Sequence, residues 1–216
     1  MTAVPLPPLP GATDEDADYR PGGRSAVEML ADEHDRIVRL GRELADPTTD
    51  PAHRRDLVEV LSATVTRHLS AEEQYLYPTV RVALPDGGTL ADREIAADVE
   101  LLRTLRDLAA TTPDDPDFDG LAATVSEQLR RHVHAAATEL FPPLRQIASD
   151  AELIRLGNRV EIAVEAAPTR PRPATPTTPP WNKVVEPALG MVDKVRDAVT
   201  RRRTYIEDLS TRPRSM

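Results

Sequence analysis

The chain has 216 residues, which is enough for one domain with a substantial core and additional terminal segments. Its formal net charge of -9 and its aromatic content of 3% argue against a nucleic-acid partner, which would need positive charge or base stacking. The absence of cysteine excludes disulfides, thiolate metal sites and thiol catalysis. The sequence has no long apolar run and no signal-peptide pattern, so we expect no transmembrane segment and a cytoplasmic, bacterial-type protein.

The amino-terminal segment, residues 1–22, is rich in proline and acidic side chains, and we expect it to be disordered. A helical region, residues 23–166, follows it. Its first helix is predicted from apolar positions at helical spacing between Val27 and Leu44, and Asp46-Pro47 ends it.

The second predicted helix opens near Pro51, because proline suits the first turn of a helix. Its apolar face also carries two polar side chains, His68 and Glu72. Pro78 is expected to bend or end this helix, and the segment 85–88 (PDGG) to form a turn.

The third predicted helix carries Ile95 to Leu108, and the segment 111–117 is read as a loop. A fourth helix carries Leu121 to Leu140, and a shorter fifth covers about 151–165. Strand patterns are missing from this region. The sequence therefore predicts an all-α, up-down-up-down four-helix bundle with a short fifth helix.

The carboxyl-terminal part divides in two. Residues 167–186 form a predicted proline-rich linker, and residues 187–216 a predicted flexible, amphipathic and basic tail helix with the cluster Arg201 to Arg203. The tail could dock on the bundle, or it could bind an anionic surface or a protein partner.

An internal echo at a spacing of 64 residues is the strongest functional signal. His34 and His68 lie 34 residues apart, and so do Asp98 and His132, which are the same positions shifted by 64. Segments 67–69 and 76–78 match 131–133 and 140–142 in the same way. At the echo of Glu72 stands Ala136, so the second half of the pattern is incomplete.

These polar residues share the apolar side of their helices. Burying imidazoles and carboxylates is costly unless they pair with each other or bind a metal ion. A set of histidine and carboxylate ligands without thiolate suits iron, manganese or zinc. We therefore predict a metal site in which five side chains meet within about 10 Å of a common centre, roughly one interhelical spacing; they are His34, His68, Glu72, Asp98 and His132.

Residues 24–165 resemble the hemerythrin-like (HHE cation-binding) family. The resemblance rests on Asp32-Glu33-His34, on the segment 68–78 (HLSAEEQYLYP), and on His132 followed by Leu140-Phe141-Pro142. It implies two non-haem irons between four helices, with one histidine each from helices 1 and 3 and a His-x-x-x-Glu motif each from helices 2 and 4. It also implies dioxygen or redox sensing, iron handling, or peroxide and nitric oxide chemistry.

The match to that pattern is partial. His34, His68, Glu72 and His132 stand where the family has ligands, whereas Asp98 replaces a histidine and Ala136 replaces a bridging carboxylate. Three interpretations follow. The site holds one metal ion, or it holds two ions with help from Asp98 and water, or it is a metal-free bundle that serves as an interaction or structural module.

The leading prediction is a non-haem iron-binding protein with a reduced site. It would sense oxygen or redox state or protect against oxidative stress, with dioxygen, another small diatomic molecule or peroxide as its ligand. Another divalent metal, or none, is the alternative. The sequence shows no independent nucleophile or catalytic base, so no catalytic residue is predicted. His53, His134 and Glu73 are predicted to be surface residues.

Overall fold

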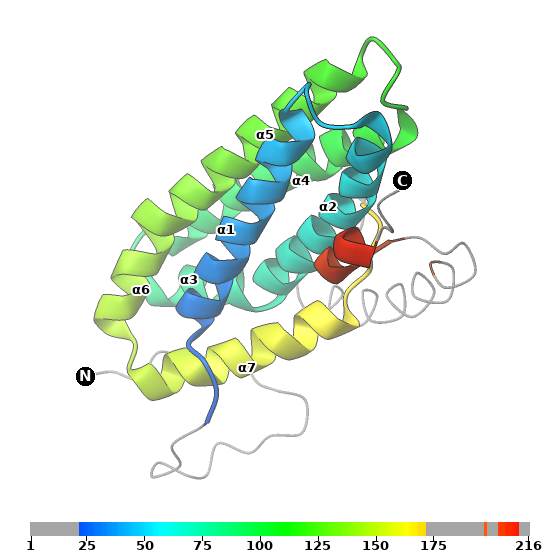
Figure 1. Cartoon of the computed structure of the whole chain (residues 1–216). Coiled ribbons are helices and arrows are strands. Elements are labelled where there is room, and N and C mark those ends of the chain that lie inside the picture. Colours follow the sequence, from blue (N-terminus) through cyan, green and yellow to red (C-terminus); the bar gives the residue numbers. More distant parts are fainter. Residues whose placement is uncertain (1–21, 172–196, 198–202, 212–216) are drawn as a thin grey trace.

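The computed structural model describes residues 22–171, 197 and 203–211, and all regular structure within them is helical (Figure 1). The predictions for segment 1–22, the linker 167–186 and the beginning of the tail lie largely outside these residues. No helix in the described part of the chain combines the length and the hydropathy that crossing a membrane would require.

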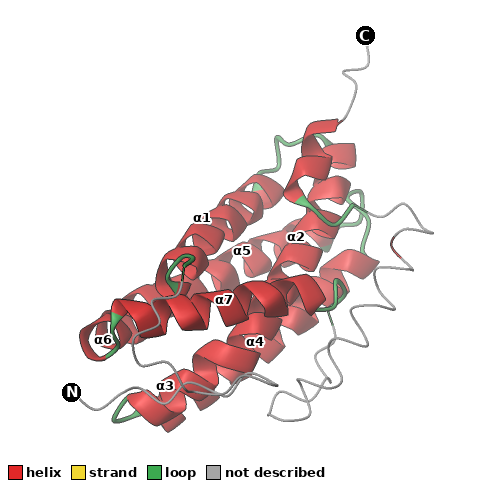
Figure 2. Ribbon diagram, turned by 90° about the horizontal axis from the view of Figure 1, so that it is seen from below, coloured by secondary structure: helices red, strands yellow, loops and turns green. Residues whose placement is uncertain are grey.

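Four long helices form the predicted bundle: α1 (Ala26–Ala45), α2 (Pro51–Ala71), α4 (Gly87–Ala110) and α5 (Phe118–Ala135). Helix α1 contacts α2 and α5, and α4 contacts the same two helices, which closes the bundle. The fifth helix, α7 (Asp150–Ala166), packs on α1 and α2 and lies across the bundle (Figure 2). The predicted architecture is therefore confirmed.

Two helices of the bundle continue through a π-helical turn. Helix α2 passes through η1 (Glu72–Leu76) into α3 (Tyr77–Ala83), and α5 passes through η2 (Ala136–Leu140) into α6 (Phe141–Ile147). All of these boundaries repeat at a spacing of 64 residues, so the echo in the sequence is also an echo in the backbone.

Proline explains the π turns. Pro78 and Pro142 are the second residues after the two turns. A proline inside a helix has no N–H to donate, and its ring clashes with the carbonyl four residues earlier. A wider turn relieves that clash while the chain stays helical. Pro78 was expected to bend or end the helix, and the structure excludes the second alternative, because the helix continues to Ala83.

Local sequence signals fix the starts of α2 and α7 and the turn from α3 to α4. Asp50 accepts a hydrogen bond from the backbone N–H of His53 and so caps α2. Ser149 and Glu152 form a reciprocal capping box at the start of α7. A Cβ atom at Gly87 would lie 1.9 Å from the backbone oxygen of Val80, so only glycine allows the close turn from α3 to α4.

The apolar core consists of two clusters with a polar layer between them. On α1, Leu30 belongs to one cluster and Ile37 to the other, with His34 between them. On α5, His132 separates Leu129 of one cluster from Ala136 of the other. The histidines therefore lie inside the bundle and not at one of its ends.

The carboxyl-terminal half of helix α2 and the η1 turn after it are buried on all sides. Every residue from 60 to 77 is buried, because the bundle covers one side while α7 and the 3-10 helix η3 (Ile206–Thr211) cover the other. From the sequence, α2 was expected to have one apolar face and Glu73 to lie at the surface. That placement was wrong: Glu73 is 6% exposed, because α7 packs over the η1 turn.

The described part of the tail docks on α2. Arg67 donates a hydrogen bond to the backbone oxygen of Thr204 at 2.6 Å. Arg203 forms an ion pair with Asp56. The apolar side chains of η3, Ile206 and Leu209, pack against the core cluster that contains Ile37. Arg203, which belongs to the basic cluster of the predicted tail helix, is therefore engaged with the bundle.

Candidate metal centre

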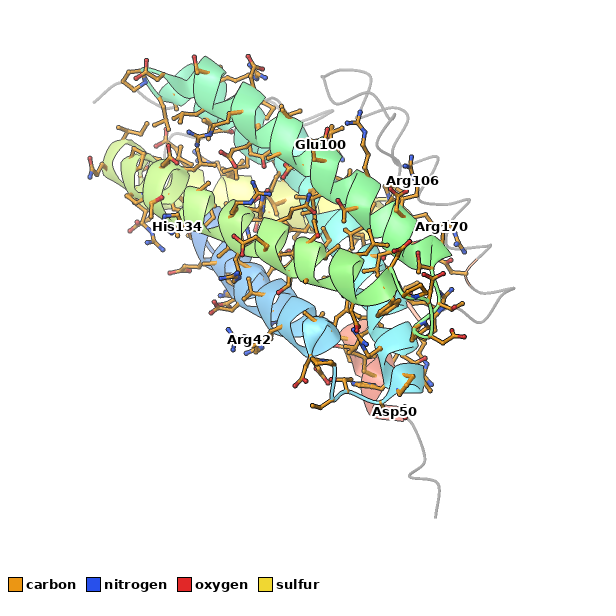
Figure 3. The ribbon with its side chains drawn as sticks, turned by 90° about the horizontal axis from the view of Figure 1, so that it is seen from above. Arg42, Asp50, Glu100, Arg106, His134 and Arg170 are labelled. Carbon is orange, nitrogen blue, oxygen red and sulfur yellow. The ribbon has the colours of Figure 1, made fainter. Side chains whose placement is uncertain are left out.

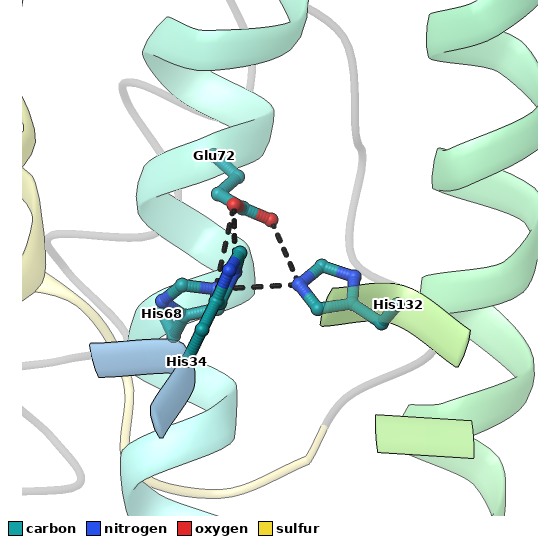
Figure 4. Close-up of side chains that lie close together, drawn as sticks. All are labelled: His34, His68, Glu72 and His132. Carbon is teal, nitrogen blue, oxygen red and sulfur yellow. Dashed lines mark hydrogen bonds and ion pairs between the residues drawn. The ribbon is translucent and has the colours of Figure 1, made fainter. Parts of the chain in front are cut away.

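Four predicted ligands converge in the polar layer of the bundle. His34 comes from α1, His68 from α2, Glu72 from the first position of η1 and His132 from α5 (Figure 4). One ligand atom of each lies within 4.8 Å of the ligand atoms of the others. All four residues are buried, and the most exposed of them, His132, is 5% exposed.

The nitrogens and oxygens of this cluster face one another. The Nε2 atom of His68 lies 2.9 Å from Nε2 of His34 and 3.3 Å from Nε2 of His132. Glu72 Oε1 lies 3.5 Å from His34 Nε2 and 3.4 Å from His68 Nε2, and it is buried without a hydrogen-bond partner. A buried acceptor of this kind is costly unless it meets a cation.

Carboxylates orient two of the histidines from behind. Glu33 Oε2 lies 3.1 Å from Nδ1 of His68, and Asp98 Oδ1 lies 3.1 Å from Nδ1 of His132. The Glu33 contact is a hydrogen bond, whereas the Asp98 contact is an ion pair whose two atoms, Asp98 Oδ1 and His132 Nδ1, have no hydrogen-bond partner. A hydrogen held on Nδ1 of His68 leaves its Nε2 directed at the centre, which is the tautomer that a metal ion needs. In the sequence, Glu33 stands out only as part of the motif Asp32-Glu33-His34, which does not predict this contact with His68.

Asp98 was predicted as a fifth ligand. The structure buries it beside the centre, but its oxygens face His132 Nδ1 and the hydroxyl of Tyr77, and it is not one of the four converging donors. Tyr77 donates to Asp98 Oδ2 at 2.6 Å and also lies 3.1 Å from Glu72 Oε2. The sequence pattern does not predict the contact of Tyr77 with Glu72, because this contact depends on the π turn.

The second half of the site is apolar where the first half is polar. Phe141 stands at the echo of Tyr77, and its ring stacks on His34 with the centroids 5.6 Å apart. Ala136, at the echo of Glu72, is buried in an apolar cluster. The incomplete echo in the sequence thus corresponds to a one-sided centre.

His34 and His68 differ in pKa although both lie beside the carboxylate of Glu72. Burial lowers the pKa of His34 to about 4. Burial also opposes protonation of His68, but Glu72 and Glu33 outweigh it and raise its pKa to about 10. The pKa of Glu72 is driven well below its usual value by His68 and His132 despite the burial of this carboxylate. Although His34 and His68 approach Glu72 equally closely, His68 holds the proton because it alone also contacts Glu33.

The same buried charges shift the pKa values of His132 and Tyr77. Burial disfavours protonation of His132, yet Glu72 and Asp98 raise its pKa. Burial together with Asp98 and Glu72 raises the pKa of Tyr77 well above its usual value, so its hydroxyl keeps its hydrogen. In the metal-free protein, a proton on His68 therefore offsets part of the charge of the buried carboxylates, and the pKa of His132 is shifted in the same direction.

The other histidines take no part in the centre. His53 pairs with Glu43 at 2.8 Å near the surface, and His134 is exposed on α5, as Figure 3 shows. Both surface predictions are confirmed. Within the described residues, the cluster of His34, His68, Glu72 and His132 is the one group of at least three such side chains close enough to hold an ion.

The donor set fits a metal ion. Three imidazole nitrogens and one carboxylate, with no thiolate, suit iron, manganese or zinc. Residues 25–144 match the sequence profile of the hemerythrin HHE cation binding domain. The chain belongs to this family. The hemerythrin HHE match ends within α6, so α7 and the docked tail lie beyond it.

Two known proteins place this HHE domain in context. A hemerythrin HHE cation binding domain-containing protein from Mycobacterium kansasii shares the fold, with a TM-score of 0.57, 22% identity, and coverage of 65% of this chain and 85% of that one. A DNA nickase from Nostoc sp. (strain PCC 7120) is 26% identical over 127 residues. That match covers 58% of this chain but only 35% of the nickase.

Proposed function

We propose that this HHE domain binds one non-haem iron ion through His34, His68, Glu72 and His132, and that it serves in oxygen or redox sensing or in protection against oxidative stress. The observation that carries the proposal is the convergence of these four donors, with Glu72 Oε1 buried and lacking a hydrogen-bond partner. A cation at the centre would satisfy that oxygen and all three Nε2 atoms.

One ion fits the donors better than two. The four ligand atoms lie within 4.8 Å of one another, so they can all point at a single centre. A second ion would need donors from the other half, where Ala136 has none and Asp98 already contacts His132 and Tyr77. These contacts support the one-ion interpretation of the incomplete echo.

Iron at this position would supply reversible one-electron chemistry and a coordination place for a small oxygen- or nitrogen-containing ligand. The side chains of the chain contribute orientation and exclusion of water. Glu33 and Asp98 lie beside the Nδ1 atoms of His68 and His132, so both Nε2 atoms face the centre and can bind an ion that displaces their protons. Burial of the whole cluster excludes bulk water.

The competing proposal is a metal-free interaction module. It is favoured by the ion pair that protonated His68 forms with Glu72, which partly balances the buried charge without a metal ion. DNA nicking is a property of the relative from Nostoc, and a match to 35% of that protein together with a net charge of -9 gives no basis for proposing it here.

Metal analysis of the purified full-length chain separates the two proposals. We expect about one iron per chain after anaerobic loading with Fe²⁺, since four donors suit one ion. His132→Ala should lose the iron, and the matched control His134→Ala, which changes an exposed histidine two residues away, should keep it. Equal and negligible iron in the wild type and both variants would favour the metal-free module.

The sensing part of the proposal needs a second measurement. The iron-loaded protein should change its visible absorption or its paramagnetic resonance spectrum on exposure to dioxygen, nitric oxide or peroxide. The same exposure should leave His132→Ala unchanged. A loaded protein whose spectra respond to none of these three molecules would retain the metal site and overturn the sensing role.

A further inference from the structure

Four side chains form a closed ring of contacts beside the metal centre. Asp98 Oδ1 lies 3.1 Å from His132 Nδ1, and Asp98 Oδ2 accepts a 2.6 Å hydrogen bond from Tyr77. The Tyr77 hydroxyl lies 3.1 Å from Glu72 Oε2, and that oxygen lies 3.3 Å from His132 Nε2. Two members of the ring are proposed ligands, and the other two are not.

The π turn creates this ring. Tyr77 follows Glu72 by five residues, and in an α-helix side chains at that spacing diverge by about 140°, because each residue turns the helix by about 100°. A π turn closes its hydrogen bond between residues five apart, and the backbone N–H of Tyr77 indeed bonds to the carbonyl oxygen of Glu72. The two side chains therefore leave the same side of the helix.

The ring distinguishes the two oxygens of Glu72. Oε2 is engaged by Tyr77 and faces His132. Oε1 has no hydrogen-bond partner and faces His34 and His68. The carboxylate is thereby held in one orientation, with one oxygen available to an ion. The one hydrogen of the Tyr77 hydroxyl lies between Asp98 Oδ2 and Glu72 Oε2, so the buried Asp98, which also forms an ion pair with His132, determines where that hydroxyl meets Glu72.

The geometry points to Asp98 and Tyr77 as a pair of positioning residues: Asp98 orients His132 directly and Glu72 through Tyr77. The inference rests on the proposed metal binding and deepens it. Asp98, which stands at the echo of a histidine, controls two of the four donors without being a donor itself. The pair thus sets the affinity and the geometry of the one-ion site.

Phe141 provides the reason to expect a hydroxyl effect and not a packing effect. It occupies the echo position in the other half, where a phenyl ring without a hydroxyl packs against His34. The fold therefore already accepts phenylalanine after a π turn. The variant Tyr77→Phe removes one oxygen and keeps the ring that fills the core.

The test compares Tyr77→Phe with Tyr75→Phe in the full-length chain. Tyr75 lies in the same π turn and is also buried, but it is not a member of the ring. We expect Tyr77→Phe to bind Fe²⁺ and Co²⁺ about tenfold to a hundredfold more weakly, the usual effect of losing an outer partner of a ligand. Its Co²⁺ visible bands should shift. Tyr75→Phe should retain both the wild-type affinity and the wild-type bands.

A double-mutant cycle with Glu72→Gln shows whether Tyr77 acts through Glu72. If it does, Tyr77→Phe weakens binding in the wild-type background and costs little more in the Glu72→Gln background. Equal losses in both backgrounds, or unchanged affinity and Co²⁺ bands in a folded Tyr77→Phe protein, would overturn the positioning role alone. Failure of the wild type to bind either ion would instead overturn the proposed function.

Discussion

At the scale of single residues, carboxylates behind the histidines decide how the centre behaves. Of these two carboxylates, Glu33 and Asp98, Glu33 is the more exposed, with 21% of its side chain accessible. It contacts His68 Nδ1 from α1. It therefore joins a buried ligand to the surface of the domain. Loss of its contact with His68 should therefore weaken metal binding as much as losing a typical hydrogen-bond partner of a metal ligand does.

Glu33→Ala should lower iron affinity about tenfold to a hundredfold, because His68 loses the carboxylate that fixes its ring. Asp35→Ala is the matched control, since Asp35 is exposed on the same helix two residues away. Competition titration against a chelator of known affinity measures the change. Equal affinities for the two variants would show that Glu33 does not orient His68.

Metal binding should release protons at neutral pH. The pKa of His68 is raised to about 10 in the metal-free protein, so His68 carries a proton at pH 7 that an ion must displace, and the pKa of His132 is shifted in the same direction. Between one and two protons should therefore leave per ion, and affinity should fall by about tenfold for each proton released and each pH unit lowered. Calorimetry in buffers of different ionisation enthalpy counts these protons. A count of zero would contradict the raised pKa values.

At the scale of helices and turns, the two halves of the bundle have the same backbone and different chemistry. The π turns η1 and η2 occur at equivalent places, yet only η1 carries a ligand, Glu72. The second half therefore provides the backbone for a carboxylate at position 136 without providing the side chain.

The double variant Asp98→His, Ala136→Glu gives up the contacts of Asp98 but gains two ligands, so its iron content should rise above that of the wild type. Glu at 136 would stand one turn after His132, as Glu72 stands after His68, and His at 98 would restore the missing imidazole. Asp98→His combined with Ala137→Glu is the control, because Ala137 is exposed. Equal iron-to-protein ratios in both folded double variants would refute the idea that the second half has lost its ligands.

The sequence predicted the bundle and the convergence of His34, His68, Glu72 and His132, because apolar periodicity and the echo both depend on helical spacing. It did not reveal the partners of these residues. Tyr77 reaches Glu72 only through a π turn, and a proline signals a disturbed helix without specifying which turn results. Burial of Glu73 depends on where α7 packs, which no local pattern encodes.

At the scale of the whole molecule, α2 is the central helix, with α1 and α4 of the bundle on one side and α7 and the described part of the tail on the other. The tail segment 203–211 lies far from α2 in sequence but is joined to it by the contacts of Arg67 and Arg203. The tail is thus part of the folded domain over these residues.

Removing residues 203–216 should lower the melting temperature. Ile206 and Leu209 are partly buried, and losing their packing should cost about 2 kcal/mol in total, which corresponds to about 4–8 °C for a chain of this size. Ile206→Ala with Leu209→Ala should reproduce part of the loss, whereas Glu207→Ala, at an exposed position between them, should not. Thermal unfolding followed by circular dichroism measures this, and an unchanged melting temperature would contradict docking.

Burial of the ligands also has a kinetic consequence. His34, His68 and Glu72 are each at most 1% exposed and His132 is 5% exposed, so a hydrated ion has no direct path to them in the closed fold. An ion can then enter or leave only while the helices transiently separate, as in other local openings of native proteins. The rate at which a strong chelator strips the iron should therefore reach a plateau set by that opening, and raising the chelator concentration further should not increase it.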